Sequence, residues 1–484
     1  MALPVSYCWI RLARLPQHPR ICAVSSLWQS IAPAGRAIGG EFHGRGGSVA
    51  LSELGTGSIF GTALESLRGR SVLLATHDQL PTALALIELD GVARRMVLCT
   101  PDLKPEQLAA VAATAQADTI VLDEASTAAA GSLAPYVAAS RPIPSPGPIQ
   151  RRAGEPTEWI LLTSGTTGTP KLVVHGLQSL GGSLPAGSPG AGTVWSTFYD
   201  IRRYGGLQIY LRAVLSGSPL VLSSAGEPPV AYMQRAAAAG VTHISGTPSH
   251  WRRALMSGEA RVLKPQYVRL SGEVADQPVL DNLRAAYPGA RIAHAFASTE
   301  AGVAFDVNDG LAGFPAEFVD HSSGGIEMKV VDHTLRIRSG RIAARYLGAA
   351  PGLLVSDDGY VDTGDMVELK DGRYHFMGRM GGVINVGGLK VYPEEVESVL
   401  NSDPRVRMSL VRARRNPITG AVVVADVVLA DTAGAAPADS PELVKSELLN
   451  ACRRTLAAHK VPAMLRFVES LEFNAAGKLV RPGV

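Results

Sequence analysis

The stretch Leu161-Leu162-Thr163-Ser164-Gly165-Thr166-Thr167-Gly168-Thr169-Pro170-Lys171-Leu172-Val173-Val174-His175 places hydroxyl residues and glycines between two apolar segments. Glycines let backbone amides approach a ligand closely, hydroxyls add donors, and successive amides in a turn form an anion-binding concavity. Lys171 adds a positive charge suited to phosphate. The pattern is not a Walker loop, which needs Gly before the lysine and Ser or Thr after it. It predicts a loop that wraps a polyphosphate; the alternative is a Ser/Gly-rich surface turn.

Composition limits the class of protein. The chain has 484 residues, 46% of them apolar and 18% charged, which is typical of a globular protein with several domains. Its net charge of +3 gives no support for nucleic-acid binding. The four cysteines have no paired spacing, which argues against a metal or disulfide framework and favours a reducing, cytoplasmic compartment. No apolar run reaches about 18 residues, so no membrane span is predicted.

Apolar strands alternate with helical patterns along most of the chain. Strands are predicted at 71–75, 95–99 and 119–122, with helices at 80–89 and 105–117 between them. The same alternation continues from residue 194 to 296. Such alternation predicts parallel sheets, whose ligands bind at the carboxyl ends of the strands.

The pattern of predicted strands and helices changes twice in the second half of the chain. From residue 325, short alternating strands, the last over 340–346, predict a small antiparallel sheet or barrel. From about 381 a separate module begins, with a helix that starts at Pro393, a strand pair 407–412 and 422–429, and a helix capped by Ser440.

We therefore expect an α/β fold with a large and a small domain. The large N-terminal domain, 49–380, would combine parallel-sheet αβ layers with a small β-barrel-like part, and a small mobile α+β domain would follow over 381–484. Residues 1–48 are expected to be poorly defined, with the glycines between 39 and 47 as a linker. This segment has no acidic residue before Glu41. A transit peptide would have that composition; a disordered tail or a wrongly chosen start codon would too, and we favour these two.

The string TSGTTGTPK at 163–171 resembles the phosphate-binding loop of the adenylate-forming superfamily, which comprises acyl- and aryl-CoA synthetases, adenylation domains and luciferases. Five motifs follow the superfamily's order, and the resemblance covers roughly residues 70–480. It implies ATP binding by the loop residues Thr163, Ser164, Gly165, Thr166, Thr167, Gly168 and Lys171, and by Gly272 and Glu273 in a later segment.

A second motif, Phe296-Ala297-Ser298-Thr299-Glu300, is similar to the superfamily's Tyr-Gly-x-Thr-Glu string. A carboxylate at the carboxyl end of a strand could hold Mg²⁺, which prefers oxygen ligands; a capped helix start explains the string equally well. The resemblance implies that Glu300 binds the metal, that Thr299 contacts a phosphate and that Phe296 lies beside the adenine. Ala297 and Ser298 then belong to the nucleotide site.

Two further motifs surround the start of the small domain. Asp365 offers a carboxylate suited to ribose hydroxyls, the alternative being a hairpin turn, and the resemblance implies that it grips the ribose together with Arg379. Gly381 occupies the hinge position, where the family commonly has Asp or Lys; its wider φ/ψ range predicts rotation with less discrete stops. By the same resemblance Gly387 and Gly388 line a pantetheine tunnel, although they could be plain turn residues.

The last motif is the Gly-Lys loop that ends in Lys478. A lone lysine near a terminus is usually a solvated surface residue. In the superfamily the lysine of this loop contacts the carboxylate and the α-phosphate during adenylation, which implies a catalytic Lys478 that offsets charge on phosphorus. Together with Glu300 and Thr299 it completes the implied catalytic set.

The acid is expected to bind near 198–207. The implied substrate residues are Tyr199, Asp200, Tyr204, Gly205 and Thr247. Asp200 could hold an ammonium group, as in amino-acid-activating members, or simply pair with the flanking Arg202 and Arg203. The Tyr-Gly-Gly turn is nearer to the pattern of acyl- and aryl-CoA ligases. We therefore expect an aromatic or medium aliphatic carboxylic acid without an α-amine.

These observations predict an ATP-dependent acid–thiol ligase that forms an acyl-adenylate and then an acyl-CoA thioester, with ATP, Mg²⁺ and coenzyme A as its cofactors. Two alternatives stay open. The enzyme could load the acyl group onto the phosphopantetheine of an acyl carrier protein. The chain could also be a degenerate adenylate-binding protein, a hypothesis motivated by Gly381 and by the altered residues 296–297.

Overall fold

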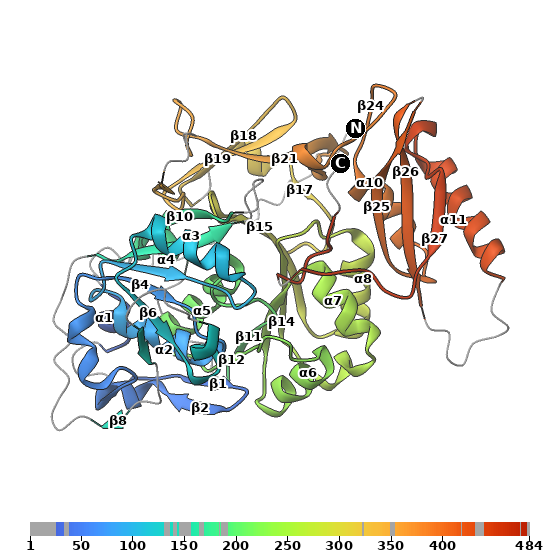
Figure 1. Cartoon of the computed structure of the whole chain (residues 1–484). Helices are drawn as coiled ribbons and strands as arrows, with labels where there is room; N and C mark the ends of the chain where they lie inside the picture. Colours follow the sequence, from blue (N-terminus) through green and yellow to red (C-terminus); the bar gives the residue numbers. More distant parts are fainter. Residues whose placement is uncertain are drawn as a thin grey trace, which may run out of the picture.

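The computed structural model describes residues 26–32, 38–129, 136–138, 143–144, 156–163, 169–182, 184, 192–321, 324–348, 354–417, 419–430, 440–474 and 476–481. Within these ranges the chain forms two unequal lobes, which lie side by side in Figure 1. The larger lobe contains three large sheets and one two-stranded pair, and the smaller lobe, at the C-terminal end, is a compact α+β unit. The predicted fold class is confirmed.

An eight-stranded sheet forms half of the large lobe, in the order β16-β15-β14-β13-β11-β12-β1-β2. The run from β15 to β1 is parallel, and the edge strands β16 and β2 are antiparallel to their neighbours. Its strands are β1 (Glu41–Gly44), β2 (Gly47–Ala50), β11 (Trp195–Thr197), β12 (Leu220–Leu222), β13 (His243–Gly246), β14 (Tyr267–Ser271), β15 (Arg291–Ser298) and β16 (Gly302–Val307). Because the central strands are parallel, their carboxyl ends meet at one edge.

A seven-stranded sheet forms the other half, in the order β20-β10-β9-β5-β4-β6-β7. Its strands are β4 (Ser71–Leu74), β5 (Arg95–Leu98), β6 (Thr119–Leu122), β7 (Tyr136–Ala138), β9 (Glu158–Thr163), β10 (Lys171–His175) and β20 (Arg345–Leu347). The two strands that flank the predicted phosphate loop, β9 and β10, form an antiparallel pair in which Thr163 lies opposite Lys171.

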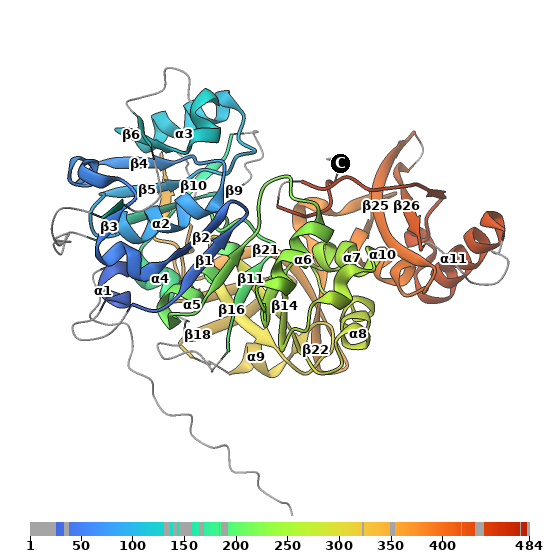
Figure 2. The ribbon, with the colours of Figure 1, turned by 90° about the horizontal axis from the view of Figure 1, so that it is seen from below.

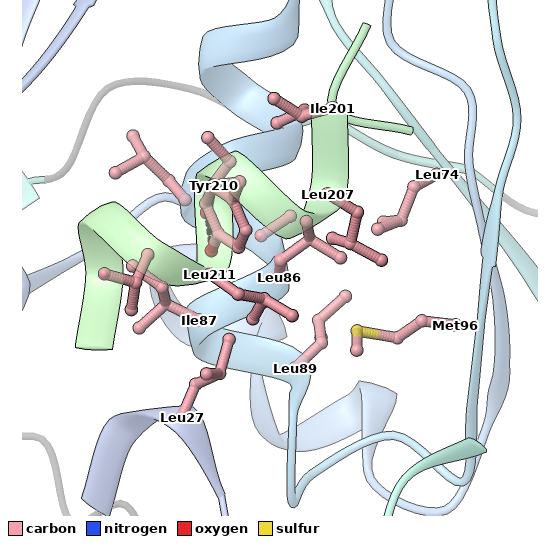
Figure 3. Packing of buried hydrophobic residues seen from close by; sticks show 14 of the residues in the cluster. Leu27, Leu74, Leu86, Ile87, Leu89, Met96, Ile201, Leu207, Tyr210 and Leu211 are labelled. Carbon is pink, nitrogen blue, oxygen red and sulfur yellow. Dashed lines mark hydrogen bonds between the residues drawn. The ribbon is translucent and has the colours of Figure 1, made fainter. Parts of the chain in front are cut away.

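Helices pack between and around these sheets. In the large lobe they are α1 (Leu27–Ile31), α2 (Gln79–Leu89), α3 (Pro105–Ala115), α4 (Leu177–Gly181), α5 (Tyr204–Ser216), α6 (Pro229–Ala238), α7 (Pro248–Met256), α8 (Gln277–Ala286) and α9 (Glu317–Asp320). The largest core cluster brings α2 and α5 together, with Leu86, Leu207 and Leu211 fully buried (Figure 3). The Tyr210 hydroxyl of α5 donates to the Ala83 carbonyl of α2 (2.7 Å). The core therefore fixes α5 against both sheets.

A five-stranded antiparallel sheet completes the large lobe, as the alternation after residue 325 predicts. Its strands are β17 (Phe314–Pro315), β18 (Ile326–Val331), β19 (Thr334–Ser339), β21 (Val361–Lys370) and β22 (Arg373–Arg379). The prediction of a strand over 340–346 within this sheet is wrong. The strand there is β20, which pairs with β10 at the edge of the seven-stranded sheet, because Tyr346 lies opposite Val173.

The N-terminal glycines do not form a linker, which corrects the sequence-based prediction. They flank the β1–β2 hairpin, and Gly40 adopts a positive φ of 97° beside the backbone of Ser218. The short helix α1 is also part of the lobe, because the Leu27 amide donates to the buried Asp90 carboxylate (2.7 Å). A small pair, β3 (Gly57–Ser58) with β8 (Ile143–Pro144), lies apart from the larger sheets. The boundary at residue 48 stays a prediction.

The small lobe follows the predicted order of elements. It contains β23 (Ile384–Val386), β24 (Leu389–Val391), α10 (Pro393–Asn401), β25 (Val406–Asn416), β26 (Gly420–Leu429), α11 (Pro441–Thr455) and β27 (Met464–Phe467). The long hairpin β25–β26 and the Ser440 cap of α11 occur as predicted. After β27 the chain runs back onto α7 of the large lobe (Figures 1 and 2). In the described ranges no helix has the length and apolarity that a membrane crossing requires.

Candidate active site

Loops at the carboxyl edge of the eight-stranded sheet carry several of the predicted site residues. They follow β11, β13, β14 and β15 and contain Tyr199, Thr247, Glu273 and Glu300 respectively. Parallel strand order alone brings these loops together. The site is therefore a product of the topology.

Tyr199 anchors the loop after β11. Its hydroxyl donates to the Ser271 carbonyl (2.6 Å) and lies 3.0 Å from the Ser271 hydroxyl, which joins the ends of β11 and β14. Burial raises the pKa of Tyr199, so the phenol stays neutral. Tyr204 begins α5, is buried, and lies beside His175, with 5.8 Å between ring centroids.

The Tyr-Gly-Gly turn at the start of α5 has a steric requirement at its second glycine. A Cβ on Gly206 would lie 2.2 Å from the Asp200 carbonyl oxygen, whereas a Cβ on Gly205 would lie at an ordinary 3.5 Å from the Tyr199 ring. We expect Gly206→Ala to lower the free energy of unfolding by about 1–3 kcal/mol, because the backbone must shift. Gly205→Ala should change it far less. Urea unfolding of both variants checks this; equal stability of the two would contradict it.

Asp200 is paired with an arginine in this structure. Arg202 binds it through Nε (2.8 Å) and Nη2 (2.6 Å), and the Arg202 amide adds a third bond (2.8 Å). The Arg202 side chain is fully buried and also donates to the carbonyls of Thr76 and His77. Of the two possibilities left open by the sequence, pairing with Arg202 is the one observed, while Arg203 binds Asp102 instead.

This pairing makes Asp200 a stability determinant. Asp200→Ala should destabilise the chain by about 3–5 kcal/mol, because it leaves the Arg202 charge buried without its partner. The folded Asp200→Ala protein should prefer the same carboxylic acids as the unmodified chain. The urea midpoint and the ratio of kcat/KM for two acids measure these effects. A stable variant with a changed acid preference would contradict this assignment and return Asp200 to the acid site.

The C-terminal Gly-Lys loop docks on the large lobe at this edge. The Thr247 hydroxyl donates to the Gly477 carbonyl (3.1 Å), and the Leu479 amide donates to Oε1 of Glu273 (3.3 Å). Glu273 is itself fixed by the Ser249 amide and hydroxyl, each at 3.0 Å. The side chain between these contacts is Lys478, whose Nζ would lie 3.6 Å from a Cβ built on Gly272.

Charges of the large lobe act on the Lys478 ammonium. Burial is the main cause that lowers the pKa of Lys478; the Glu273 and Asp365 carboxylates oppose this, and the Arg379 guanidinium adds to it. Arg203 acts in the same direction as Arg379. The lysine thus lies among the residues predicted to bind the nucleotide, although it comes from the far end of the chain.

Asp365 and Arg379 form the second part of this group. They lie opposite each other on β21 and β22, and the Arg379 Nε donates to Asp365 Oδ1 (3.1 Å). Desolvation raises the pKa of Asp365, although Arg379 and Lys478 both oppose the rise. The hairpin-turn alternative is wrong, because Asp365 lies within a strand. The Arg379 side chain is 67% exposed, so its donors can turn toward a ligand.

Glu300 lies at the turn between β15 and β16. A helix does not begin there, which excludes the capped-helix explanation of the motif. The Tyr346 hydroxyl donates to Glu300 Oε1 (3.3 Å), and the Lys171 Nζ lies 5.4 Å from the centroid of the same tyrosine ring. Lys171, Tyr346 and Glu300 therefore connect the end of the predicted phosphate loop to the predicted metal ligand. The described residues contain no group of three or more His, Cys, Asp or Glu side chains that could hold a metal ion.

The residues before Glu300 have separate partners. The Thr299 carbonyl oxygen lies 2.7 Å from His175 Nε2, and burial lowers the pKa of His175 to about 4, so the ring is neutral. The Phe296 ring stacks on Phe376, with 5.2 Å between centroids. The Ser298 hydroxyl accepts from the Ala301 amide and shapes the turn. Ala297 pairs with Val303 of β16 just after a register shift between Phe296 and Ala297.

Five residues of the predicted phosphate loop lie outside the described residues: Ser164, Gly165, Thr166, Thr167 and Gly168. The two ends of the loop are described. The Thr163 hydroxyl is buried and has no hydrogen-bond partner in the described part of the chain. The role of the loop residues in phosphate binding stays a prediction.

The hinge and tunnel glycines occupy ordinary turns in the small-lobe region. Gly381 lies in a short 3₁₀ turn with open space around its Cα, and its φ is not positive, so no steric constraint requires a glycine there. Gly387 and Gly388 have φ of 60° and 88° and form the turn between β23 and β24. This conformation explains both glycines as turn residues. A role in hinge motion or thiol binding stays a prediction.

No sequence motif identifies one residue of the site, His250. The His250 ring stacks on Phe198 (5.3 Å between centroids), and its Nδ1 lies 3.1 Å from the Thr247 hydroxyl. A Cβ on Gly477 would lie only 1.8 Å from its Nε2. Burial lowers the pKa of His250 to about 3, so the ring is neutral. His250 is thus the surface on which the Gly-Lys loop rests; its one local signal is its place three residues after Thr247, the N-cap of α7.

Comparisons with known proteins show the family and the fold of this chain. A family model described as "AMP-binding enzyme" matches residues 74–352, and its C-terminal domain model matches 395–478. A 2-succinylbenzoate–CoA ligase of Geobacillus kaustophilus is 30% identical over 66% of this chain and 67% of its own length. The ligase of the same name from Salmonella typhimurium is 29% identical over 77% and 80%. A crystal structure of the anthranilate CoA ligase AuaEII in complex with anthranoyl-AMP shares the fold, with a TM-score of 0.75 at 17% identity and 96% coverage of both chains.

Proposed function

This chain belongs to the AMP-binding enzyme family and is an AMP-forming acid–thiol ligase, and we propose that it activates an aromatic or medium aliphatic acid as an acyl-adenylate and transfers the acyl group to coenzyme A. The observation that carries the proposal is the docking of the Lys478 loop beside Glu273, Asp365 and Arg379. A cation delivered to this point suits a reaction in which negative charge develops on phosphorus.

The proposed chemistry has two balanced steps. In the first, a carboxylate oxygen attacks the α-phosphorus of ATP and pyrophosphate leaves. In the second, the thiol of coenzyme A loses its proton and attacks the acyl carbonyl, and AMP leaves with the oxygen that came from the acid. The residues proposed to act in the first step are Lys478, which offsets charge at phosphorus, and Asp365 with Arg379, which hold the ribose.

Mg²⁺ is proposed to bind at Glu300. Mg²⁺ commonly takes one or two carboxylates together with phosphate oxygens of the substrate and retained water, so a single carboxylate fits such a site. One oxygen of Glu300 accepts from the Tyr346 hydroxyl, and Lys171 lies over the ring of the same tyrosine, an arrangement that suits a metal-bound phosphate. When bound, the metal would neutralise charge on the phosphates of ATP.

Movement of the small lobe is proposed to separate the two steps. The docked loop is held by polar contacts such as those of Thr247 and Glu273, and it would leave with its lobe once pyrophosphate departs. The lobe would then admit the thiol.

Pyrophosphate release with ATP and Mg²⁺ across a panel of aromatic and aliphatic acids tests the function. We expect release that depends on the acid and, when coenzyme A is added, an acyl-CoA with the mass of that acid. Acyl-adenylate that coenzyme A does not discharge, but a phosphopantetheinylated carrier protein does, would favour the carrier-protein alternative. Binding of acyl-AMP without pyrophosphate release from any acid would favour a degenerate adenylate-binding protein.

A further inference from the structure

A group of polar side chains lies inside the large lobe, between α5 and the eight-stranded sheet. Tyr204 and Arg212 are separated by eight residues on α5 and so share a face with Gln208 midway between them. Both Tyr204 and Arg212 feel the charges of Arg269 on β14 and of Arg341. We call this group the polar cluster; it comprises Tyr204, Gln208, Arg212, Arg269, Asp306 and Arg341.

The charges of the polar cluster do not balance. Asp306 binds Arg269 (Nε to Oδ1, 2.8 Å), and Arg341 donates to the Val303 carbonyl (2.9 Å). Asp306 is the carboxylate that acts on all three arginines. Burial raises the pKa of Tyr204, so its phenol adds no negative charge. Three guanidiniums thus share one carboxylate, and burial together with the Arg269 charge lowers the pKa of Arg212.

Two donors of the polar cluster have no acceptor in the described part of the chain. Nη2 of Arg269 and Nε of Arg212 are buried and unpaired there, as is the acceptor Oε1 of Gln208. The Arg269 side chain is only 4% exposed. An unpaired buried donor of a charged group is costly, and water would satisfy the hydrogen bond without balancing the charge. An anionic group would do both.

The polar cluster lies on the acid side of the proposed active site. Arg269 and Ser271 are two residues apart on β14 and so point to the same face, about 7 Å apart along the strand. Ser271 binds the Tyr199 hydroxyl, and the Arg269 charge also acts on that phenol. Opposite them on β15 stand Ala293 and Ala295, whose small side chains occupy little of this face.

We propose that the acid carries a second anionic group, most simply a carboxylate, which binds Arg269 and Arg212 while the reacting carboxylate lies at the sheet edge near Lys478. This inference rests on the proposed function and narrows its substrate class to acids with two carboxylates separated by a ring or a short chain. The guanidinium edge suits a carboxylate, because it offers paired donors in a fixed geometry.

Three matched pairs of acids test it: 2-succinylbenzoate against 3-benzoylpropionate, terephthalate against benzoate, and adipate against hexanoate. Each pair differs by one carboxylate. For at least one pair we expect kcat/KM for pyrophosphate release to favour the diacid by about 10²-fold or more, because the monoacid leaves the arginines unpaired. Arg212→Met should remove most of this preference while kcat/KM for the monoacid stays within a few-fold. Arg212 is the residue of choice because Asp306 keeps its Arg269 partner in that variant.

Calorimetric titration of the same acids into the protein separates this inference from the proposed function. Tighter binding of a diacid that Arg212→Met abolishes would support the anionic subsite even if no acid released pyrophosphate. Preference for the monoacid in all three pairs, in turnover and in binding, would overturn the subsite and leave the ligase assignment intact. A diacid preference that Arg212→Met and Arg269→Met both leave unchanged would also overturn it.

Discussion

Lys478→Ala is expected to reduce acid-dependent ATP–pyrophosphate exchange by about 10²–10³-fold, the range measured when a single stabilising group is removed from a preorganised site. The reason is positional. The lysine lies at the carboxyl edge of the eight-stranded sheet, and charges of Glu273, Asp365, Arg379 and Arg203 act on its ammonium. Without it, charge that develops on the α-phosphorus would lack its nearest cation from the small lobe.

The control for this variant is Lys445→Ala, because Lys445 lies on α11, at the far side of the small lobe (Figure 1), where it pairs with Glu442 of the same helix at 4.0 Å. Exchange by that variant should match the unmodified chain. A further measurement separates the steps: when acyl-AMP is supplied, Lys478→Ala should form acyl-CoA at a near-normal rate. Undiminished exchange would remove Lys478 from adenylation, and equal loss of both steps would indicate a general defect.

Gly477→Ala is expected to reduce the same exchange by about 10–10²-fold, although the mutated residue carries no chemistry. A Cβ at this position would lie 1.8 Å from Nε2 of His250, and the φ of 69° is unfavourable for alanine. The loop must therefore lift from its seat and carry Lys478 with it. A displacement of about 1 Å at a reacting centre can cost 10²-fold in rate.

A double variant distinguishes the collision from the backbone strain. His250→Ala removes the ring that the new methyl group would meet but leaves φ unchanged. Gly477→Ala with His250→Ala should therefore exchange pyrophosphate faster than Gly477→Ala alone. Gly289→Ala is the matched control, because its Cβ would meet no atom within 4 Å. Equal rates for the single and double variants would show that the His250 ring does not seat the loop.

The sequence predicts what depends on local pattern and on ordered motifs. The parallel strands around 71–122 and 194–296, the β25–β26 hairpin and the Ser440 cap all occur close to their predicted bounds. Each is encoded by apolar periodicity or by a capping residue over a short stretch of chain. The convergence of Thr247 and Glu273 also follows from the predicted strands, because parallel topology fixes where strand ends meet.

Features that depend on distant partners could not be predicted in this way. The partner of Asp200 is Arg202 and not Arg203. The buried Arg202 guanidinium also donates to the carbonyls of Thr76 and His77, and these acceptors from a distant part of the chain favour Arg202 as the partner. The glycine-rich N-terminal stretch forms a hairpin at the edge of the eight-stranded sheet, and Gly40 before it has a positive φ where it approaches Ser218. Such proximity leaves no periodic signal in the sequence.

Two other residues show the same limit. The strand at 345–347 leaves the antiparallel sheet that precedes it in the chain and joins β10, so sequence neighbourhood assigned it to the wrong sheet. His250 acquires its role from Gly477, more than two hundred residues away, and a lone histidine in a helix gives no hint of such a contact.

The most direct test of the account follows the oxygen atoms of the acid. The protein would be incubated with ATP, Mg²⁺, coenzyme A and an acid labelled with ¹⁸O in its reacting carboxylate, and the products analysed by mass spectrometry. Attack of the carboxylate on the α-phosphorus predicts one labelled oxygen in AMP, none in pyrophosphate, and an acyl-CoA that retains the other. Label in inorganic phosphate, or acyl-CoA formed while AMP stays unlabelled, would contradict it.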